Sequence, residues 1–471
     1  MTHPKTRRNE ALAYWVGVSR ATLGQLADEL ARTARSHERF DIEPDRSRIS
    51  RWVNKSEQPR RPVPEFLAET LTRLCGLAGP LTLADIGLAG ATASRPSHNW
   101  RSQTVVSAII DTTRSDAVTD DAAPIVNTLL HGPQLIDAVQ PWLHLPDGGA
   151  LPDATRPGRI GMSDVAAIQA TTDVFRGLDN AHGGGLSWRA VVGQLHAVTD
   201  KARQGRVSDE VGRQLFVSVA DLASVAGWMA HDVGRHERAQ EYLLLGLKAA
   251  KQAGPDGAAI AGHLLNCLAR QANHLGSPGD ALDLVQLAQY GTRKLPPGRL
   301  RAMLCTLEAR CHAVLGQLPD CGRALGAAED ALAAERDASE TPSWAAWFDS
   351  AEYQVTVGVC EHLAAEHDPN RGRRAARAIK MIQTGTAERP DERTRSRAFD
   401  QIALARATLR AGHLDAADEV TATALDLLGQ VNSTRVIDRL RELDSELAAA
   451  PAAKETSQAR ERIRAALPAA A

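Results

Sequence analysis

Residues 45–61 read DRSRISRWVNKSEQPRR, and this stretch predicts a short helix with two unlike faces. Asp45 is a good helix N-cap, because its carboxylate accepts hydrogen bonds from the free N–H groups of the first turn. Ile49, Trp52 and Val53 then follow at helical spacing and would form one buried face. The segments on either side are therefore expected to supply the core on which that face packs.

The opposite face of this helix is basic and polar, which suits binding to nucleic acid. From Arg46 to Arg61 there are six Arg or Lys residues and one acidic residue, a local charge of +5 in a chain whose net charge is −2. Such side chains donate hydrogen bonds to phosphates and to base edges. The alternative is a solvated basic helix that caps a core. The predicted DNA contacts are Arg46, Ser47, Arg48, Ser50, Arg51, Asn54, Lys55, Arg60 and Arg61.

Helical patterns flank the basic helix on both sides. Residues 9–18 predict a first helix, and Ser19 is the predicted cap of a second one. After the basic helix, Pro62 and Pro64 break the chain before a fourth apolar-periodic segment. The order of these segments predicts a small all-helical domain over residues 1–88.

The segment SRISRW (47–52), followed by KSEQPR (55–60) and a further helix, resembles the repressor-type helix-turn-helix domain found at the N-terminus of many bacterial regulators. In such domains a recognition helix lies in the major groove of DNA. One departure is the link of residues 36–44, which is longer than the tight turn of that motif. The resemblance therefore implies groove binding and leaves the docking angle open.

Composition indicates a folded all-α protein. The 471 residues are rich in Ala, Leu and Arg, aromatic residues make up 4%, and helical periodicity is common while strand-like alternation is rare. We find neither a signal peptide nor an apolar run of about 18 residues, so we expect a cytoplasmic protein that has no membrane partner. The six cysteines form no CxxC pair and are expected to be free, and we expect neither a metal nor another cofactor.

Four segments are expected along the chain. Residues 1–88 are the DNA-binding candidate, and residues 89–158, which are rich in breaks, are interpreted as a helical connector. Residues 159–450 contain helical patterns broken at regular intervals, which is typical of a repeat array. Residues 451–471 would form a C-terminal helix or tail.

The repeat pattern is centred on Gly234, Gly276, Gly316 and Gly412. Counting from each of these glycines, the positions seven residues before, five after and twelve after are always Gly, Ala or Cys. Small residues at such positions let two antiparallel helices approach closely. The register resembles the tetratricopeptide repeat, although these repeats recur at about 40 to 48 residues and the family's repeat has about 34. A generic helical array is the alternative, and either would form a solenoid with an inner groove.

If the tetratricopeptide register holds, first-helix positions line that inner groove. Arg recurs at one equivalent site in three repeats, and Asn residues flank the first of them. Arg pairs with carboxylates and Asn with peptide backbone, so the row suits a short peptide or an acidic metabolite. The alternative is that these arginines pair internally with acidic residues and serve stability. The predicted ligand contacts are Trp228, His231, Asn266, Arg270, Asn273, Arg310 and Arg406.

The whole chain resembles a family of actinobacterial regulators. The helix-turn-helix segment is followed by repeats that contain GWMAHDVGRHERAQEYLLLGL (227–247) and LARQANHLGSPGDAL (268–282). Members of that family include negative regulators of differentiation and antibiotic production. The resemblance implies a transcriptional regulator that binds a double-stranded DNA operator. Because one short helix reads few base pairs, a homodimer on two half-sites is expected.

Enzymatic function is not expected. His182 is followed by three glycines, as in the oxyanion-hole stretch of some esterases, but the partner motif GxSxG is absent from the sequence. A turn between two helices is the preferred interpretation of that stretch. The remaining alternative to a DNA-binding regulator is a repeat adaptor that scaffolds a partner protein without binding DNA.

Overall fold

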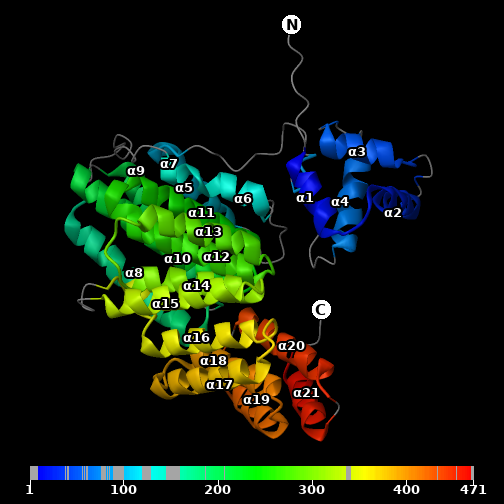
Figure 1. Ribbon diagram of the computed structural model, residues 1–471. Helices are drawn as coiled ribbons and strands as arrows, with labels where there is room; N and C mark the ends of the chain where they lie inside the picture. Colours follow the sequence, from blue (N-terminus) through cyan, green and yellow to red (C-terminus); the bar gives the residue numbers. More distant parts are fainter. Residues whose placement is uncertain are drawn as a thin grey trace. The chain divides into compact units, whose positions relative to one another are not determined.

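The structure is a computed structural model that describes residues 9–467 apart from residues 38, 40–41, 56, 58, 60–61, 76–80, 82, 84, 89–99, 119–128, 145–159, 186, 206, 336–340, 432 and 452. All regular secondary structure in these residues is helical, which confirms the all-α prediction (Figure 1). None of the described helices is both long enough and apolar enough to cross a membrane. The chain forms two compact units, Met1–His98 with Pro124–Val139 and Asn99–Ala123 with Gln140–Ala471, called here the N-terminal and C-terminal units.

The described residues of the N-terminal unit form five helices, of which the first four share one apolar core. They are α1 (Glu10–Val18), α2 (Leu23–Ser36), α3 (Arg46–Asn54), α4 (Val63–Leu74) and α6 (Gly132–Val139). The core joins Leu12 and Trp15 of α1, Leu26 and Leu30 of α2, Ile49, Trp52 and Val53 of α3, and Phe66, Leu67 and Leu71 of α4. The face predicted to be buried on the basic helix therefore does pack on its neighbours.

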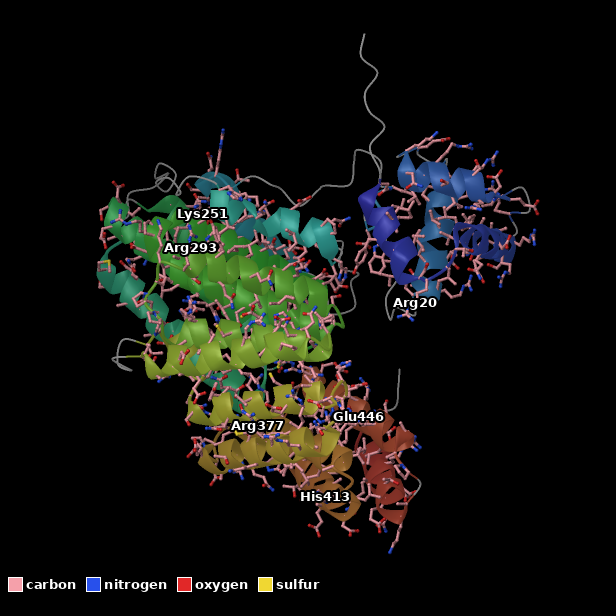
Figure 2. The ribbon with its side chains drawn as sticks, viewed as in Figure 1. Arg20, Lys251, Arg293, Arg377, His413 and Glu446 are labelled. Carbon is pink, nitrogen blue, oxygen red and sulfur yellow. The ribbon has the colours of Figure 1, made fainter. Side chains whose placement is uncertain are left out.

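Side-chain caps mark the starts of α1, α2 and α3. The predicted cap is found at Asp45, whose carboxylate accepts from the Arg48 N–H at 2.7 Å. The cap predicted at Ser19 is wrong: Ser19 ends α1, and its hydroxyl donates to the Val16 carbonyl at 2.8 Å. Thr22 caps α2 instead, in a capping box with Gln25. Arg20, labelled in Figure 2, separates the two helices with a φ of 54°.

The helices of the predicted connector are shared between the two units. α6 packs on α1, where the ring of His131 makes an edge contact with Trp15 at 5.6 Å. α5 (Ser102–Val118) packs on helices of the C-terminal unit, and its Val105, Val106, Ile109 and Ile110 are buried. α7 (Pro141–His144) also belongs to the C-terminal unit. The functional domain proposed for residues 1–88 stays a prediction.

The C-terminal unit continues with one helix after another, most of them paired with the next. The further helices are α8 (Met162–His182), α9 (Trp188–Gln204), α10 (Asp209–Asp232), α11 (His236–Gln252), α12 (Ala258–His274), α13 (Pro278–Thr292), α14 (Arg299–Val314), α15 (Leu318–Ala333), α16 (Ser350–Ala364), α17 (Arg371–Glu388), α18 (Thr394–Arg410), α19 (Leu414–Leu428), α20 (Thr434–Ala449) and α21 (Lys454–Ala466). Five consecutive pairs pack tightly, from α10 with α11 to α18 with α19. Their identity as tetratricopeptide repeats stays a prediction.

The four glycines of the register form the same helix-ending turn. Gly234, Gly276, Gly316 and Gly412 have φ between 73° and 83°, a conformation that glycine adopts without steric cost. After each glycine, the next N–H reaches back to a carbonyl of the preceding helix, as from Ser277 to Ala272 at 2.9 Å. This pattern is the Schellman motif. The turn between α16 and α17 has no such glycine, so the register does not extend to this pair.

The first helices of the pairs form a row, and the end of the row returns to its start. Each of α10, α12, α14, α16, α18 and α20 contacts the next one, and α18 also contacts α8. Arg395 of α18 forms an ion pair with Asp179 of α8 at 3.0 Å, across 216 positions of sequence. Ser433, just before α20, donates to Asp232 at the end of α10 at 2.9 Å. The row therefore encloses a space within the C-terminal unit.

Candidate functional sites

The α3 helix of the N-terminal unit presents a polar, basic face to solvent. Arg46, Ser47, Arg48, Asn54 and Lys55 are exposed, and Ser50 and Arg51 are partly buried. Ile49 on the opposite side is fully buried, and Trp52 and Val53 are nearly so. The division of the helix follows the predicted pattern, but burial does not test DNA contact. The predicted contacts Arg60 and Arg61 lie outside the described residues.

Two polar residues of this face are already held by neighbours. The Nε atom of Arg51 lies 3.0 Å from a carboxylate oxygen of Glu57, and Asn54 donates to Ser50 at 3.2 Å. By contrast, Arg46, Arg48 and Lys55 have no ion-pair partner among the described residues. An exposed ion pair is worth about 0–1 kcal/mol, so Arg51 can exchange Glu57 for another acceptor at little cost.

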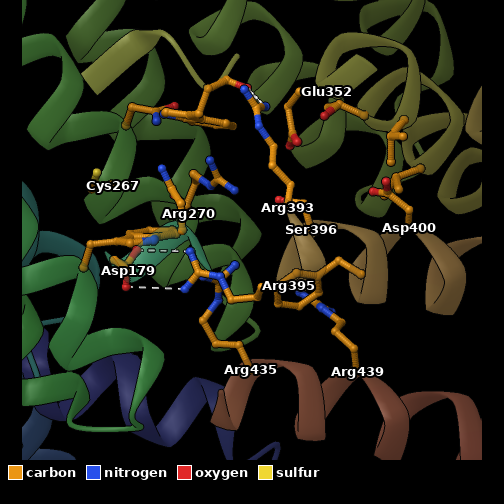
Figure 3. A pocket seen from close by; sticks show the side chains of 18 of the residues that line it. Asp179, Cys267, Arg270, Glu352, Arg393, Arg395, Ser396, Asp400, Arg435 and Arg439 are labelled. Atoms are coloured by element: carbon orange, nitrogen blue, oxygen red, sulfur yellow. Dashed lines mark hydrogen bonds and ion pairs between the residues drawn. The ribbon is translucent and has the colours of Figure 1, made fainter. Parts of the chain in front are cut away.

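The C-terminal unit contains a cavity of about 220 Å³ and an adjoining one of about 90 Å³. The larger cavity is lined by residues of α8, α10, α12, α14, α16, α18 and α20, and by Trp344 and Trp347 from the segment before α16. The two cavities share several lining residues, including Trp228, Asn266, Arg270 and Arg310. Figure 3 shows labelled side chains from helices far apart in the sequence that meet around the larger cavity.

All seven residues predicted to contact a ligand line one or both of these cavities. Trp228, Asn266, Arg270, Arg310 and Arg406 line the larger one, and His231 and Asn273 line the smaller one. The repeat register thus selected residues that the fold places around the same cavities, although they are up to 178 positions apart, from Trp228 to Arg406. Their place around a cavity is a geometric result, and their role in ligand binding stays a prediction.

Arginine is the most frequent residue in the lining of the larger cavity. Its lining includes three acidic residues, Asp179, Glu352 and Asp400, and eight arginines, Arg176, Arg270, Arg310, Arg393, Arg395, Arg406, Arg435 and Arg439. Six of these arginines have acidic partners. Arg406, for example, reaches Glu442 at 2.8 Å and Glu446, which is labelled in Figure 2, at 2.6 Å. The internal pairing considered as an alternative is therefore real for Arg406.

Arg270 and Arg310 have no hydrogen-bond or ion-pair partner among the described residues. The Arg270 guanidinium lies over two indole rings, 4.9 Å from the centroid of Trp228 and 4.8 Å from that of Trp347. Burial lowers the pKa of Arg270, and it lowers the pKa of Arg310 to about 10, with Arg439 contributing. The Nε atom of Arg310 is buried without a partner. These two arginines therefore differ from the other six in the lining, which have acidic partners.

A third arginine joins the same aromatic cluster. The Arg435 guanidinium lies 4.6 Å from the Trp228 centroid and 5.1 Å from that of Phe399. It also forms an ion pair with Asp232 at 3.4 Å. Burial lowers its pKa to about 9, helped by repulsion from Arg270 and Arg395. Trp228 therefore contacts two guanidinium groups, those of Arg270 and Arg435, beside the cavity.

Acidic residues near the cavity are engaged in buried networks. Asp179 and Asp232 share Arg395, with contacts of 3.0 and 3.1 Å. Asp400 and Glu352 share Arg389, with contacts of 2.5 and 2.9 Å. Burial raises the pKa of Asp400 to about 7, although Arg389 opposes the shift. These carboxylates hold helices together, so they do not neutralise Arg270 or Arg310 through contact.

Sequence reasoning missed several residues of the cavity. Arg435 and Arg439 lie one helical turn apart on α20, and Trp344 and Trp347 precede α16. The glycine register does not include the pair α16 and α17 and does not extend to α20, so it could not predict that these residues line the cavity. The spacing of Arg435 and Arg439 was a usable signal, because residues four apart share a helix face.

Histidine rings gather beside the smaller cavity without forming a recognisable metal site. His231, His236 and His274 have ring centroids 5.1 to 6.0 Å apart. In the part of the chain that the structure describes, no group of three or more His, Cys, Asp or Glu residues is placed to hold a metal ion. The six cysteines are free, and all except Cys75 are buried.

One family model matches the chain, over residues 12–89, and it is described as the SP15 N-terminal domain. The matched segment includes α1 to α4 and thus the basic face of α3. No curated protein sequence matches the chain. The match covers less than a fifth of the 471 residues, so it describes the N-terminal segment alone.

Proposed function

We propose that the protein is a cytoplasmic DNA-binding transcriptional regulator. In this proposal α3 lies in a groove of a double-stranded DNA operator, and the helical array senses a peptide or small-molecule signal and mediates dimerisation. The observation that carries the DNA-binding part is the division of α3, since Ile49, Trp52 and Val53 anchor it while Arg46, Arg48 and Lys55 remain exposed without ion-pair partners among the described residues. A helix held in this way offers donors to phosphates and bases.

The residues of α3 differ in what they are expected to contact. Arg48 is exposed on α3, and an arginine can pair with guanine through two hydrogen bonds; such a bidentate contact is worth about 1–3 kcal/mol of discrimination against the wrong base. Arg51 is a second candidate, once it leaves Glu57. Arg46 and Lys55, at the two ends of the helix, are assigned to phosphates, with Arg60 and Arg61.

A gel shift of the full chain on DNA from the region upstream of its own coding sequence tests the proposal. Arg48→Ala should reduce the preference for that DNA over an unrelated duplex by about tenfold, the equivalent of about 1.4 kcal/mol. Lys55→Ala, the matched control, should weaken binding to both duplexes alike. The proposal is wrong if neither duplex shifts, and the alternative of a repeat adaptor then takes its place.

A binding role without catalysis is part of the proposal. The residues after His182 form the turn between α8 and α9. The Gly184 N–H donates to Asp232 at 3.3 Å, and a side chain at this glycine would collide with the backbone of Met229. This N–H is therefore already used to connect the turn with the end of α10. The glycine run has a structural task that accounts for it.

A further inference from the structure

The C-terminal unit shows how its structural arginines are satisfied. Arg406 contacts two glutamates, Arg395 two aspartates, and Arg176 lies 2.6 Å from Asp221. A buried charge without a partner is costly, and pairing reduces that cost. Arg310 occupies the position of the repeat register equivalent to that of Arg406 but has no ion-pair or hydrogen-bond partner among the described residues. The two residues are therefore a natural pair for comparison.

Arg270 is held in place by rings and not by acids. Indole rings interact with the face of a guanidinium, whereas its N–H donors lie in its plane. Contact with Trp228 and Trp347 thus fixes the group without using those donors. The strongest influence of opposite sign on Arg270 comes from Glu352, which already contacts Arg389 at 2.9 Å. Arg270 is prepared to donate two parallel hydrogen bonds to an anion.

The volume of the cavity limits the size of what it binds. A cavity of about 150 Å³ holds benzene, and drug-sized ligands occupy about 300–1,000 Å³. The larger cavity, at about 220 Å³, lies between these cases, and the adjoining one adds about 90 Å³. Asn266, Thr356 and Ser396 line the larger cavity and offer neutral hydrogen bonds. The space suits a small metabolite better than a folded or extended peptide.

We propose that this cavity binds a small organic anion carrying at least two negative charges, a dicarboxylate or a phosphate monoester, and that Arg270 and Arg310 are its principal donors. The inference rests on the proposed sensing function and narrows it from a peptide or small molecule to one chemical class. Arg435 supplies further positive charge from its position against Trp228. Binding of the anion would give Arg270 and Arg310 the acidic partner that they lack among the described residues.

Thermal unfolding of the full chain without ligand separates a ligand-binding arginine from a structural one. Arg406→Met removes the cation that contacts Glu442 and Glu446. Glu442 keeps its contact with Arg439, but Glu446 loses its ion-pair partner, so Tm should fall by a few degrees. Arg310→Met removes an unpaired cation, so Tm should stay the same or rise. A fall in Tm for Arg310→Met as large as that for Arg406→Met would assign Arg310 to stability and overturn the proposal.

Calorimetric titration of the full chain then tests the ligand class. The probes are glutarate and glycerol 3-phosphate, with glutaramide and glycerol as their uncharged counterparts, and a tripeptide of glutamate. Glutarate or glycerol 3-phosphate should bind and raise Tm by mass action. Whichever of the two binds identifies the acid group, and Arg310→Met should weaken that binding at least about tenfold.

Three outcomes of the titration would overturn the proposal. They are binding of neither small anion, equal binding of an anion and its uncharged counterpart, and binding of the tripeptide alone. The titration contains no DNA, so its result does not depend on α3. Failure here leaves the DNA-binding part intact, and a failed gel shift leaves anion binding to be decided by this experiment.

Discussion

His274 combines burial with a cationic neighbourhood. Its side chain is 9% exposed, and its Nδ1 atom has no hydrogen-bond partner among the described residues. Burial lowers its pKa to about 3, with Arg435 and Arg439 adding repulsion, even though Asp438 lies 3.6 Å away. His263, stacked on Trp344 at 4.7 Å, has its pKa lowered to about 3 by burial as well. Both imidazoles are therefore neutral in the folded protein at neutral pH.

These histidines predict a loss of stability in mild acid. An unfolded histidine titrates near pH 6.5, so between about pH 6.5 and 3 the unfolded chain binds protons that the folded chain rejects. Above that range these histidines do not change the free energy of unfolding. Within it, each such histidine lowers the free energy of unfolding by about 1.4 kcal/mol for every unit by which the pH decreases. His274→Gln should remove about 2 kcal/mol of the difference in unfolding free energy between pH 6.5 and 5.

Urea unfolding of the full chain at the two pH values measures this effect. The matched control is His413→Gln. His413 is an exposed histidine at the start of α19 and is labelled in Figure 2. If the His274→Gln protein shows the same pH dependence as the unsubstituted chain, burial of His274 does not govern its titration.

At the residue scale, the sequence predicted three arginines that line the cavity but not which of them have acidic partners. The register placed Arg270, Arg310 and Arg406 at equivalent sites, and all three line the larger cavity. It did not distinguish Arg406, which is neutralised by α20, from the two that have no such partner. That difference depends on Glu442 and Glu446, which reach Arg406 only after folding brings α20 against α18. Local spacing contains no information about such long-range contacts.

At the scale of elements, glycine has opposite effects in a turn and in a helix. Gly276 ends α12 with a φ of 82°, and Gly322 lies exposed within α15. An added Cβ would meet nothing within 4 Å at either site, so packing does not enter the comparison. Gly276→Ala should destabilise by about 1–2 kcal/mol, because an L-residue is strained at positive φ. Gly322→Ala should stabilise by about 0.5–1 kcal/mol through helix propensity.

Thermal melts of the two glycine variants, each compared with the unsubstituted chain, check this prediction. The Tm should fall for Gly276→Ala and rise for Gly322→Ala. An unchanged or higher Tm for Gly276→Ala would mean that the Schellman turn does not depend on the glycine conformation.

Helices themselves were largely predictable, because their signals are local. Apolar periodicity identified α1 to α4, and the glycine register located the turns after α10, α12, α14 and α18. The cap at Ser19 was mistaken because Thr22 with Gln25 competes for the same start and forms two hydrogen bonds. The return of α18 and α20 to α8 and α10 was not predictable, since it involves an ion pair and a hydrogen bond between residues more than 200 positions apart.

At the scale of the whole molecule, the two compact units have different proposed roles, DNA binding and ligand binding. The N-terminal unit offers a basic helix face, and the C-terminal unit offers a cationic cavity. A regulator that senses a ligand must couple the two, so that anion binding changes DNA affinity and DNA changes anion affinity by the same factor. A helix of nine residues reads few base pairs, and a homodimer would supply a second copy for an adjacent half-site. Light scattering should therefore return two chains for each operator duplex.

The measurement that tests the central claim most directly is the affinity of the full chain for a labelled duplex from its own upstream region at about 50 and 200 mM salt. Phosphate contacts by Arg46, Lys55, Arg60 and Arg61 predict a loss of about a hundredfold per chain across this range, from a slope of about −0.9 for each contact. Lys55→Gln should reduce the slope by about that amount for each chain bound. Equal affinity at the two salt concentrations would contradict DNA binding through α3.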